Sequence, residues 1–412
     1  MIVCYVIIFS IQFIFLVNIM KEEIKMNRVK KIFAVVLSVL MMMSCASLFA
    51  SADEKDATLK FGDDGKFTIL QFADIQDGYP LMTITKKLLQ DTIAMVQPDL
   101  IVLTGDNISG GSTTTKVITH AAINEFMRIF EKAGIPTAAV FGNHDDESAL
   151  ADKDFQMSVY ESYDCFVGYN EGDAIPGVGT YNLPIMSSDG EKVAFNIWMT
   201  DSGTYNTEND LGGYACTTKE QIAWYVEKSN ELKAANCGNP VPSINFQHII
   251  VPEIYDALVE CAEGTPESIQ RGDKFLTLPE GVEGHLHEAP CPPDYNNGQF
   301  DAFKQQGDVL ATVCGHDHKN DFVIPYEGID IINTPGVGFS SYNDETVGSR
   351  VFVLDENDTS TYETYVLGYF DVYGEDDEVA LYRYQAYSRT TDDLTKFVAW
   401  FKMIFAMIKA MF

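Results

Sequence analysis

The chain has 412 residues, of which 46% are hydrophobic and 21% are charged. That composition is sufficient for a full-sized hydrophobic core and argues against a disordered, collagen-like or solenoid chain. The formal net charge is -32 at pH 7, from 28 basic and 60 acidic side chains. An acidic surface repels a phosphate backbone, so we expect no nucleic-acid-binding surface. Any anionic substrate must be attracted locally, and bound metal ions are one source of such attraction.

The N-terminal region, residues 1–52, has the pattern of a targeting sequence. From Met26 a basic segment precedes an apolar run at 32–43 and a small-residue cleavage site at 50–52. This pattern predicts a signal peptide at 26–52 and an exported protein, either secreted or associated with the cell surface. The upstream apolar stretch at 1–20 is either a gene-model extension ahead of a true start at Met26 or a membrane segment.

Short apolar runs, each followed by a polar or glycine-rich turn, alternate with amphipathic segments of helical length. This alternation is typical of an α/β domain. We expect strands at 67–72, 100–103, 137–141, 194–199, 244–248, 309–314, 330–333 and 351–354, and helices near 83–96, 117–133 and 218–235. The stretch 262–300 is rich in Gly, Pro, Asn and acidic residues, which predicts a long irregular insertion.

The C-terminal segment 397–412 is apolar almost all round when drawn as a helix, and Lys402 and Lys409 interrupt it on one face. At about 1.5 Å per residue, such a helix is too short to cross a bilayer core. Two alternatives remain: a terminal helix packed on the body, or a helix that makes peripheral membrane contact. We therefore divide the chain into the targeting region, a catalytic domain at 53–370 and a C-terminal extension at 371–412.

Five short motifs follow predicted strands. They are Asp74-Ile75-Gln76, Gly105-Asp106-Asn107, Gly142-Asn143-His144-Asp145, Gln247-His248 and Gly315-His316-Asp317-His318. Each motif alone is weak, because such residues are common in turns and caps. Together they bring carboxylate, amide and imidazole groups to strand ends, where open α/β sheets present functional groups. This ligand set suits a hydrolytic centre of two iron, zinc or manganese ions.

With these motifs, the chain resembles the calcineurin-like metallophosphoesterases over residues 66–354. The family pattern is D-x-H, G-D, G-N-H-D/E, a lone His and G-H-x-H, so the resemblance implies the family's four-layer α/β/β/α sandwich. The purple-acid-phosphatase-like branch is closer. Its LDSG, FHIPLPE and GHDHxND segments have counterparts at 200–203, 246–253 and 315–321.

The resemblance implies roles for individual residues. The residues that it assigns to metal binding are Asp74, Gln76, Asp106, Asn143, His248, His316 and His318. Asp106 would bridge the two ions. His144 would contact the phosphate and protonate or stabilise the leaving oxygen, and Asp145 would orient His144. Asn107 is either a phosphate contact or a turn residue.

The chain departs from the family pattern at Gln76, where the first motif normally ends in His. An amide oxygen binds transition metals more weakly than an imidazole does, so the metal identity stays open. True purple acid phosphatases have a tyrosine ligand shortly after the bridging Asp, whereas Ser109 stands at the third position after Asp106. The resemblance therefore implies a colourless protein.

The sequence predicts a phosphoric ester hydrolase that cleaves a small-molecule phosphomonoester with a water bridging two metal ions. One alternative is a phosphodiesterase or nucleotidase, because the same centre supports those reactions. The other is a non-catalytic metal-binding surface protein, which Gln76 motivates. His144 argues against it, since a binding protein needs no leaving-group acid.

Overall fold

The computed structural model describes residues 58–172, 175–207 and 212–409. The chain divides into two compact units, Met1–Asp56 and Ala57–Phe412. The predicted signal peptide and the question of Met1 or Met26 as the start lie outside the described residues.

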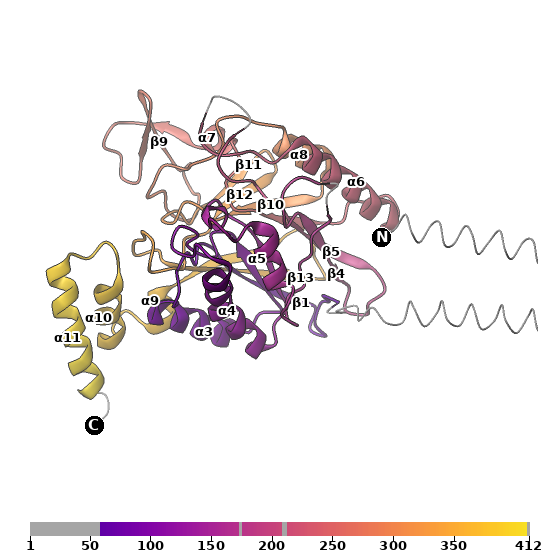
Figure 1. Cartoon of the computed structure of the whole chain (residues 1–412). Helices are drawn as coiled ribbons and strands as arrows, with labels where there is room; N and C mark the ends of the chain where they lie inside the picture. Colours follow the sequence, from indigo (N-terminus) through magenta and orange to yellow (C-terminus); the bar gives the residue numbers. More distant parts are fainter. Residues whose placement is uncertain (1–57, 173–174, 208–211, 410–412) are drawn as a thin grey trace, which may run out of the picture. The chain divides into compact units, whose positions relative to one another are not determined.

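Across the described residues, strands form sheets of five, six and three strands (Figure 1). The five-stranded sheet has the order β14-β13-β1-β2-β3, with strands Glu363–Gly368, Gly348–Asp355, Lys66–Phe72, Leu100–Thr104 and Thr137–Val140. The neighbours β1, β2 and β3 are parallel, whereas β13 and β14 run antiparallel to their neighbours. Every residue of β2 and β3 is buried, as expected for parallel strands covered on both faces.

The six-stranded sheet has the order β11-β12-β10-β6-β5-β4. Its strands are Val323–Tyr326, Ile329–Asn333, Val309–Cys314, Ser243–Phe246, Val193–Met199 and Tyr181–Met186. The central four, β12, β10, β6 and β5, are parallel, and the edge strands β11 and β4 are antiparallel to their neighbours. Both sheets therefore have parallel centres whose carboxyl ends can carry functional loops.

Helices connect the parallel strands and cover the outer faces of the sheets. Ahead of β14, the helices of at least eight described residues are α3 (Thr83–Val96), α4 (Lys116–Ala133), α5 (Lys153–Tyr160), α6 (Lys219–Ala235) and α8 (Gln299–Gln306). The ends of α4 show how the sequence sets such limits. The Thr115 side chain accepts a hydrogen bond from the Ile118 N–H, and Gly134 ends the helix with a left-handed φ of 70°.

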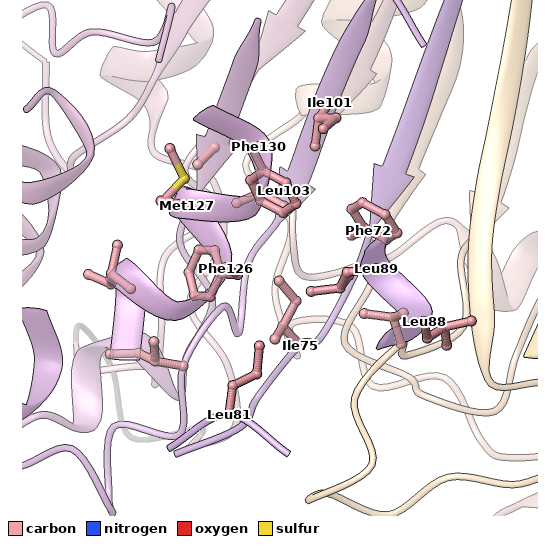
Figure 2. Packing of buried hydrophobic residues seen from close by; sticks show 14 of the residues in the cluster. Phe72, Ile75, Leu81, Leu88, Leu89, Ile101, Leu103, Phe126, Met127 and Phe130 are labelled. Atoms are coloured by element: carbon pink, nitrogen blue, oxygen red, sulfur yellow. The ribbon is translucent and has the colours of Figure 1, made fainter. Parts of the chain in front are cut away.

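Three buried apolar clusters separate four layers. One cluster joins the inner faces of the two sheets and includes Phe246 and Phe352. A second joins the five-stranded sheet to α3 and α4, where Phe72 stacks on Phe130 with ring centroids 6.0 Å apart (Figure 2). The third joins the six-stranded sheet to α6 and α8. The result is a four-layer α/β/β/α sandwich, which confirms the predicted fold class.

The predicted strands correspond to β1, β2, β3, β5, β6, β10, β12 and β13, and the predicted helices to α3, α4 and α6. The edge strands β4, β11 and β14 were not predicted. Two of them, β4 and β11, contain Pro184 and Pro325. Proline lacks an N–H group, so it lowers the strand signal and is tolerated chiefly at sheet edges. Part of the stretch expected to be irregular is also regular. It contains β8 (Ile269–Arg271) and β9 (Lys274–Thr277), which form a small sheet with β7 (Val259–Cys261) just ahead of it.

The C-terminal part of the described chain is helical after β14. It contains α9 (Tyr369–Tyr373), α10 (Glu378–Tyr387) and α11 (Asp393–Lys409). Tyr369 of α9 and Tyr384 of α10 join the outer core beside Phe339. No helix in the described ranges is long and apolar enough to span a membrane.

The Phe352→Ala substitution should lower the free energy of unfolding by about 3–5 kcal/mol. Phe352 is fully buried on β13, and its ring meets Phe246 of the other sheet edge-on at 5.5 Å. Urea denaturation of the wild-type protein and of the variant measures this difference in the free energy of unfolding. Val117→Ala, at a residue of α4 that is 80% exposed, is the control and should change stability by less than about 0.5 kcal/mol. Equal effects would contradict a core between the sheets.

Candidate metal centre

The five motifs meet where the loops after β1, β2, β3, β6 and β10 converge. Backbone hydrogen bonds link these loops. The N–H of Asp74 donates to the carbonyl of Gly105 over 3.2 Å, and the N–H of Gly315 donates to the carbonyl of His248 over 3.2 Å. The carboxyl ends of the two sheets thus place side chains from distant parts of the chain beside one another.

Asp106 belongs to two buried clusters of potential metal ligands. Ligand atoms of Asp74, Asp106 and His318 lie within 4.8 Å of one another, and so do those of Asp106, His248 and His316. The Nε2 atom of His318 is 3.3 Å from Oδ1 of Asp74, and the Nε2 atom of His248 is 3.3 Å from Oδ2 of Asp106. A carboxylate shared by two clusters is the arrangement that a dinuclear centre requires.

Two amide side chains complete this group. Oδ1 of Asn143 lies 3.1 Å from Nε2 of His248. Nε2 of Gln76 donates to Oδ2 of Asp106 over 3.3 Å, and Oε1 of Gln76 is buried without a hydrogen bond. The structure therefore brings together all seven residues that the sequence assigned to metal binding.

The donor set fits two metal ions. Besides Oε1 of Gln76, Nε2 of His316 is buried and makes no hydrogen bond. A buried polar atom without a partner costs about 1–3 kcal/mol, which a bound cation would offset. Nδ1 of His248 is 2.9 Å from the carbonyl of Thr104, and Nδ1 of His318 is 2.8 Å from that of Tyr342. Each carbonyl accepts a hydrogen bond from Nδ1–H, which leaves Nε2 as the ring atom that can face a metal ion.

Charges of opposite sign in the centre shift one another's pKa values. Burial raises the pKa of Asp106, but His248 and the other nearby histidines outweigh burial and hold that pKa below its ordinary value. Burial lowers the pKa of His248, but Asp106 outweighs it and raises the pKa to about 9. Burial and then His248 lower the pKa of His316 well below its ordinary value. A metal ion must displace the His248 proton, so metal binding should weaken as pH falls.

Close approach of the loops depends on unusual backbone geometry. Asp74, Gln76, Asp106 and His316 have positive φ angles of 52°, 39°, 47° and 72°. Such left-handed angles are costly for non-glycine residues and concentrate at functional sites. Gly142 contributes in another way. A Cβ atom there would lie 2.1 Å from Oδ1 of Asp106, so only glycine fits.

Asp145 shapes the loops and does not orient His144 as predicted. Its carboxylate accepts the backbone N–H groups of Asn107, Ile108 and Gly142 over 3.3, 3.1 and 2.8 Å. Burial, followed by repulsion from Asp106, raises the pKa of Asp145 to about 7. The prediction failed because a carboxylate between two turns is satisfied by backbone amides before it can reach the imidazole.

His144 lies at the rim of the centre. Its N–H donates to Oδ1 of Asp106 over 2.7 Å, and its imidazole is 37% exposed. The partner of its Nδ1 atom is Oε2 of Glu147, 2.8 Å away. Glu147 follows in the short helix Asp145–Glu147, and the i,i+3 spacing from His144 was the available sequence signal.

Asn107 is buried behind the centre. Its side-chain amide donates to the carbonyl of Val140 over 2.9 Å. Asn107 was expected to be either a phosphate contact or a turn residue, and this hydrogen bond favours the turn residue.

Three tyrosines that the sequence analysis did not single out surround the centre. The Tyr205 hydroxyl donates to Oε1 of Glu147 over 2.8 Å and accepts from Nδ2 of Asn143 over 3.2 Å. Tyr214 meets His316 edge-on at 4.4 Å, and Tyr342 stacks on His318 at 4.2 Å. These tyrosines lie in loops far from the motifs in sequence, so no local pattern marks them.

The chain is similar in sequence to proteins of one known family. A family model described as calcineurin-like phosphoesterase matches residues 67–320. Two Arabidopsis thaliana proteins, named probable inactive purple acid phosphatases 14 and 29, are 29% and 27% identical to this chain. Each alignment covers 78% of this chain, and the alignments cover 83% and 85% of the two relatives. A crystal structure of a dimetal phosphatase from Danio rerio aligns with 70% of this chain and 93% of its own, with a TM-score of 0.47 and 14% identity.

The Gly142→Ala substitution should weaken metal binding by about 10–100-fold, because the added methyl group displaces Asp106. Calorimetric titration of the metal-stripped protein with Mn²⁺ or Zn²⁺ measures the affinity. Gly111→Ala is the matched control, since a Cβ atom there meets one atom within 4 Å, Oε2 of Glu147 at 3.6 Å. Unchanged affinity in the Gly142 variant would contradict metal binding at Asp106.

Proposed function

Because this chain belongs to the calcineurin-like phosphoesterase family, whose members depend on a dinuclear metal centre, we propose that it hydrolyses a small phosphomonoester. The observation that carries the proposal is the position of Asp106, which is common to both ligand clusters. Asp74, Gln76 and His318 would hold one ion with Asp106. Asn143, His248 and His316 would hold the other.

Oxygen and imidazole donors of this kind suit iron, manganese or zinc. When bound, the ions would supply a water of lowered pKa and positive charge beside the phosphate. In a chain of net charge -32, this local charge would attract the anionic substrate. The protein must therefore bind its metals before it can bind its substrate well.

His144 would serve the leaving group. Its backbone hydrogen bond to Asp106 fixes it beside the centre, and Nε2 lies 4.0 Å from Oδ2 of Asp106. With Nδ1 held by Glu147, Nε2 is the ring atom that can give a proton to the departing alcohol oxygen. The Tyr205 hydroxyl hydrogen-bonds to both Glu147 and Asn143. It therefore connects the residue that holds the His144 ring to one of the proposed metal ligands.

A non-catalytic metal-binding protein is the main alternative. Gln76 stands where the family pattern has His, and the two Arabidopsis relatives are named probable inactive phosphatases. The intact arrangement of His144, Glu147 and Tyr205 favours catalysis, because metal binding alone does not need a positioned acid at the rim.

The tyrosines favour one particular monoesterase, a nucleotidase. Tyr205 and Tyr214 stack with centroids 5.8 Å apart, and Tyr342 is 46% exposed above His318. Aromatic faces bind nucleobases by stacking. The acidic surface would disfavour leaving groups with further negative charge. A nucleoside monophosphate satisfies both conditions.

We assign the activity to residues 53–370 and further propose that residues 26–52 direct export. The sequence pattern of a basic segment, an apolar run and a small-residue cleavage site supports export. An exported enzyme would act on phosphate esters outside the cytoplasm, whether secreted or held at the cell surface.

The His144→Gln substitution should lower kcat by about 10²–10⁴-fold, the usual contribution of a general acid. Metal-stripped protein is reconstituted with manganese, iron or zinc and assayed with 4-nitrophenyl phosphate and its bis-ester. His120→Gln, at an exposed histidine of α4, is the control and should retain activity. Metal content, measured by mass spectrometry, should be unchanged in both variants.

The outcomes separate the candidate functions. Faster turnover of the monoester supports a phosphomonoesterase, whereas faster turnover of the bis-ester indicates a phosphodiesterase. Binding of two ions without turnover for any metal would establish the non-catalytic alternative.

The Tyr342→Leu substitution should raise KM for adenosine monophosphate by about tenfold, because stacking contributes about 1–3 kcal/mol per base. Steady-state kinetics compares adenosine monophosphate with glycerol 3-phosphate, whose KM should not change. Tyr365→Leu, at a 49% exposed tyrosine of β14, is the matched control. An equal loss for both substrates would mean that Tyr342 acts only by supporting His318.

A further inference from the structure

Helix α11 exposes a continuous apolar stripe. Large apolar side chains along one face of the described helix are between 41% and 72% exposed: Leu394, Phe397, Val398, Phe401, Phe405 and Ile408. Their spacing of three, four and seven residues aligns them on a single face. Single exposed apolar residues are normal on a protein surface, whereas an ordered stripe of them indicates an interaction site.

The fold itself does not use this stripe. On the other side of α11, Ala399, Met403 and Ala406 are buried, and α10 is the element against which α11 packs. Figure 1 shows α11 (yellow) outside α10. Two alanines and one methionine thus attach the helix to the protein, while large aromatic and aliphatic groups face outward.

The charges on α11 differ from those of the whole chain. The helix contains three lysines and one aspartate, whereas the chain has a net charge of -32. Lys402 lies over the Tyr382 ring at 5.2 Å, and Lys409 pairs with Glu378 of α10 over 3.2 Å. Both lysines therefore border the stripe on the side of α10. In this position their ammonium groups can reach lipid headgroups while the stripe lies deeper.

We propose that α11 is an interfacial membrane anchor, which lies in the plane of a lipid surface with its stripe in the headgroup and acyl boundary. Its 17 residues extend for about 25 Å, and no described helix can span a membrane. Aromatic residues such as Trp400 and Phe401, whose rings are 5.0 Å apart, are suited to this boundary. The lysines complement anionic headgroups.

A second copy of the chain is a less favourable occupant. Pairing two α11 stripes would bring the bordering lysines of both copies together and would also bring together two chains of net charge -32. Like charges in close proximity oppose such pairing. Anionic headgroups would instead attract the lysines that border the stripe.

The test uses the unit Ala57–Phe412, which contains all three buried clusters and can therefore be produced without the N-terminal apolar segments. Vesicles of phosphatidylcholine and phosphatidylglycerol should sediment with the wild-type unit. Phe397→Ser/Phe405→Ser, at residues 63% and 70% exposed, should lower the partition coefficient by about 100-fold. Circular dichroism and thermal melts should be unchanged, because these side chains are outside the core.

Met95→Ser/Val117→Ser is the matched control, since these residues of α3 and α4 are 53% and 80% exposed. This variant should bind vesicles like the wild type. The proposal is overturned if the wild-type unit stays in the supernatant, or if the phenylalanine variant binds equally well. It is also overturned if light scattering without lipid shows a dimer that the phenylalanine variant dissociates, because the stripe would then be covered by a second copy.

Discussion

The burial of the Asp106 carboxylate is the constraint on which the rest of the site depends. A carboxylate removed from water is stable only when positive groups or hydrogen-bond donors surround it. Here His248, the N–H of His144 and the amide of Gln76 supply those interactions. These three residues come from different loops. The Asp106 carboxylate therefore connects loops at the ends of both sheets. The same groups would surround a pair of metal ions.

This constraint accounts for the strain around the centre. Side chains must leave the strands and turn at once toward Asp106, which places Asp74, Gln76 and His316 in left-handed backbone conformations. The surrounding sandwich maintains that geometry, since buried clusters fix the strands on either side. The free energy gained by burying these clusters thus offsets the cost of the left-handed backbone angles at the centre, as is common at functional sites.

The sequence was informative where a physical requirement is local. Apolar runs such as 309–314 predicted strands, because a strand that is buried on both faces needs apolar residues throughout. The motifs predicted metal ligands because they follow those strands directly. The partners of these groups were not predictable. Tyr214 and Tyr342, for example, contact His316 and His318 from separate loops. Such contacts depend on loop packing, which leaves no periodic pattern.

The edge strands of the six-stranded sheet have a further consequence. Pro184 in β4 and Pro325 in β11 are both exposed, and each removes one N–H group from an outer edge of the sheet. An incoming strand from another chain would find an interrupted row of donors at either edge. The prolines therefore oppose growth of the sheet by strand addition. During folding, when such edges are open to other molecules, these two prolines would protect the protein from aggregation.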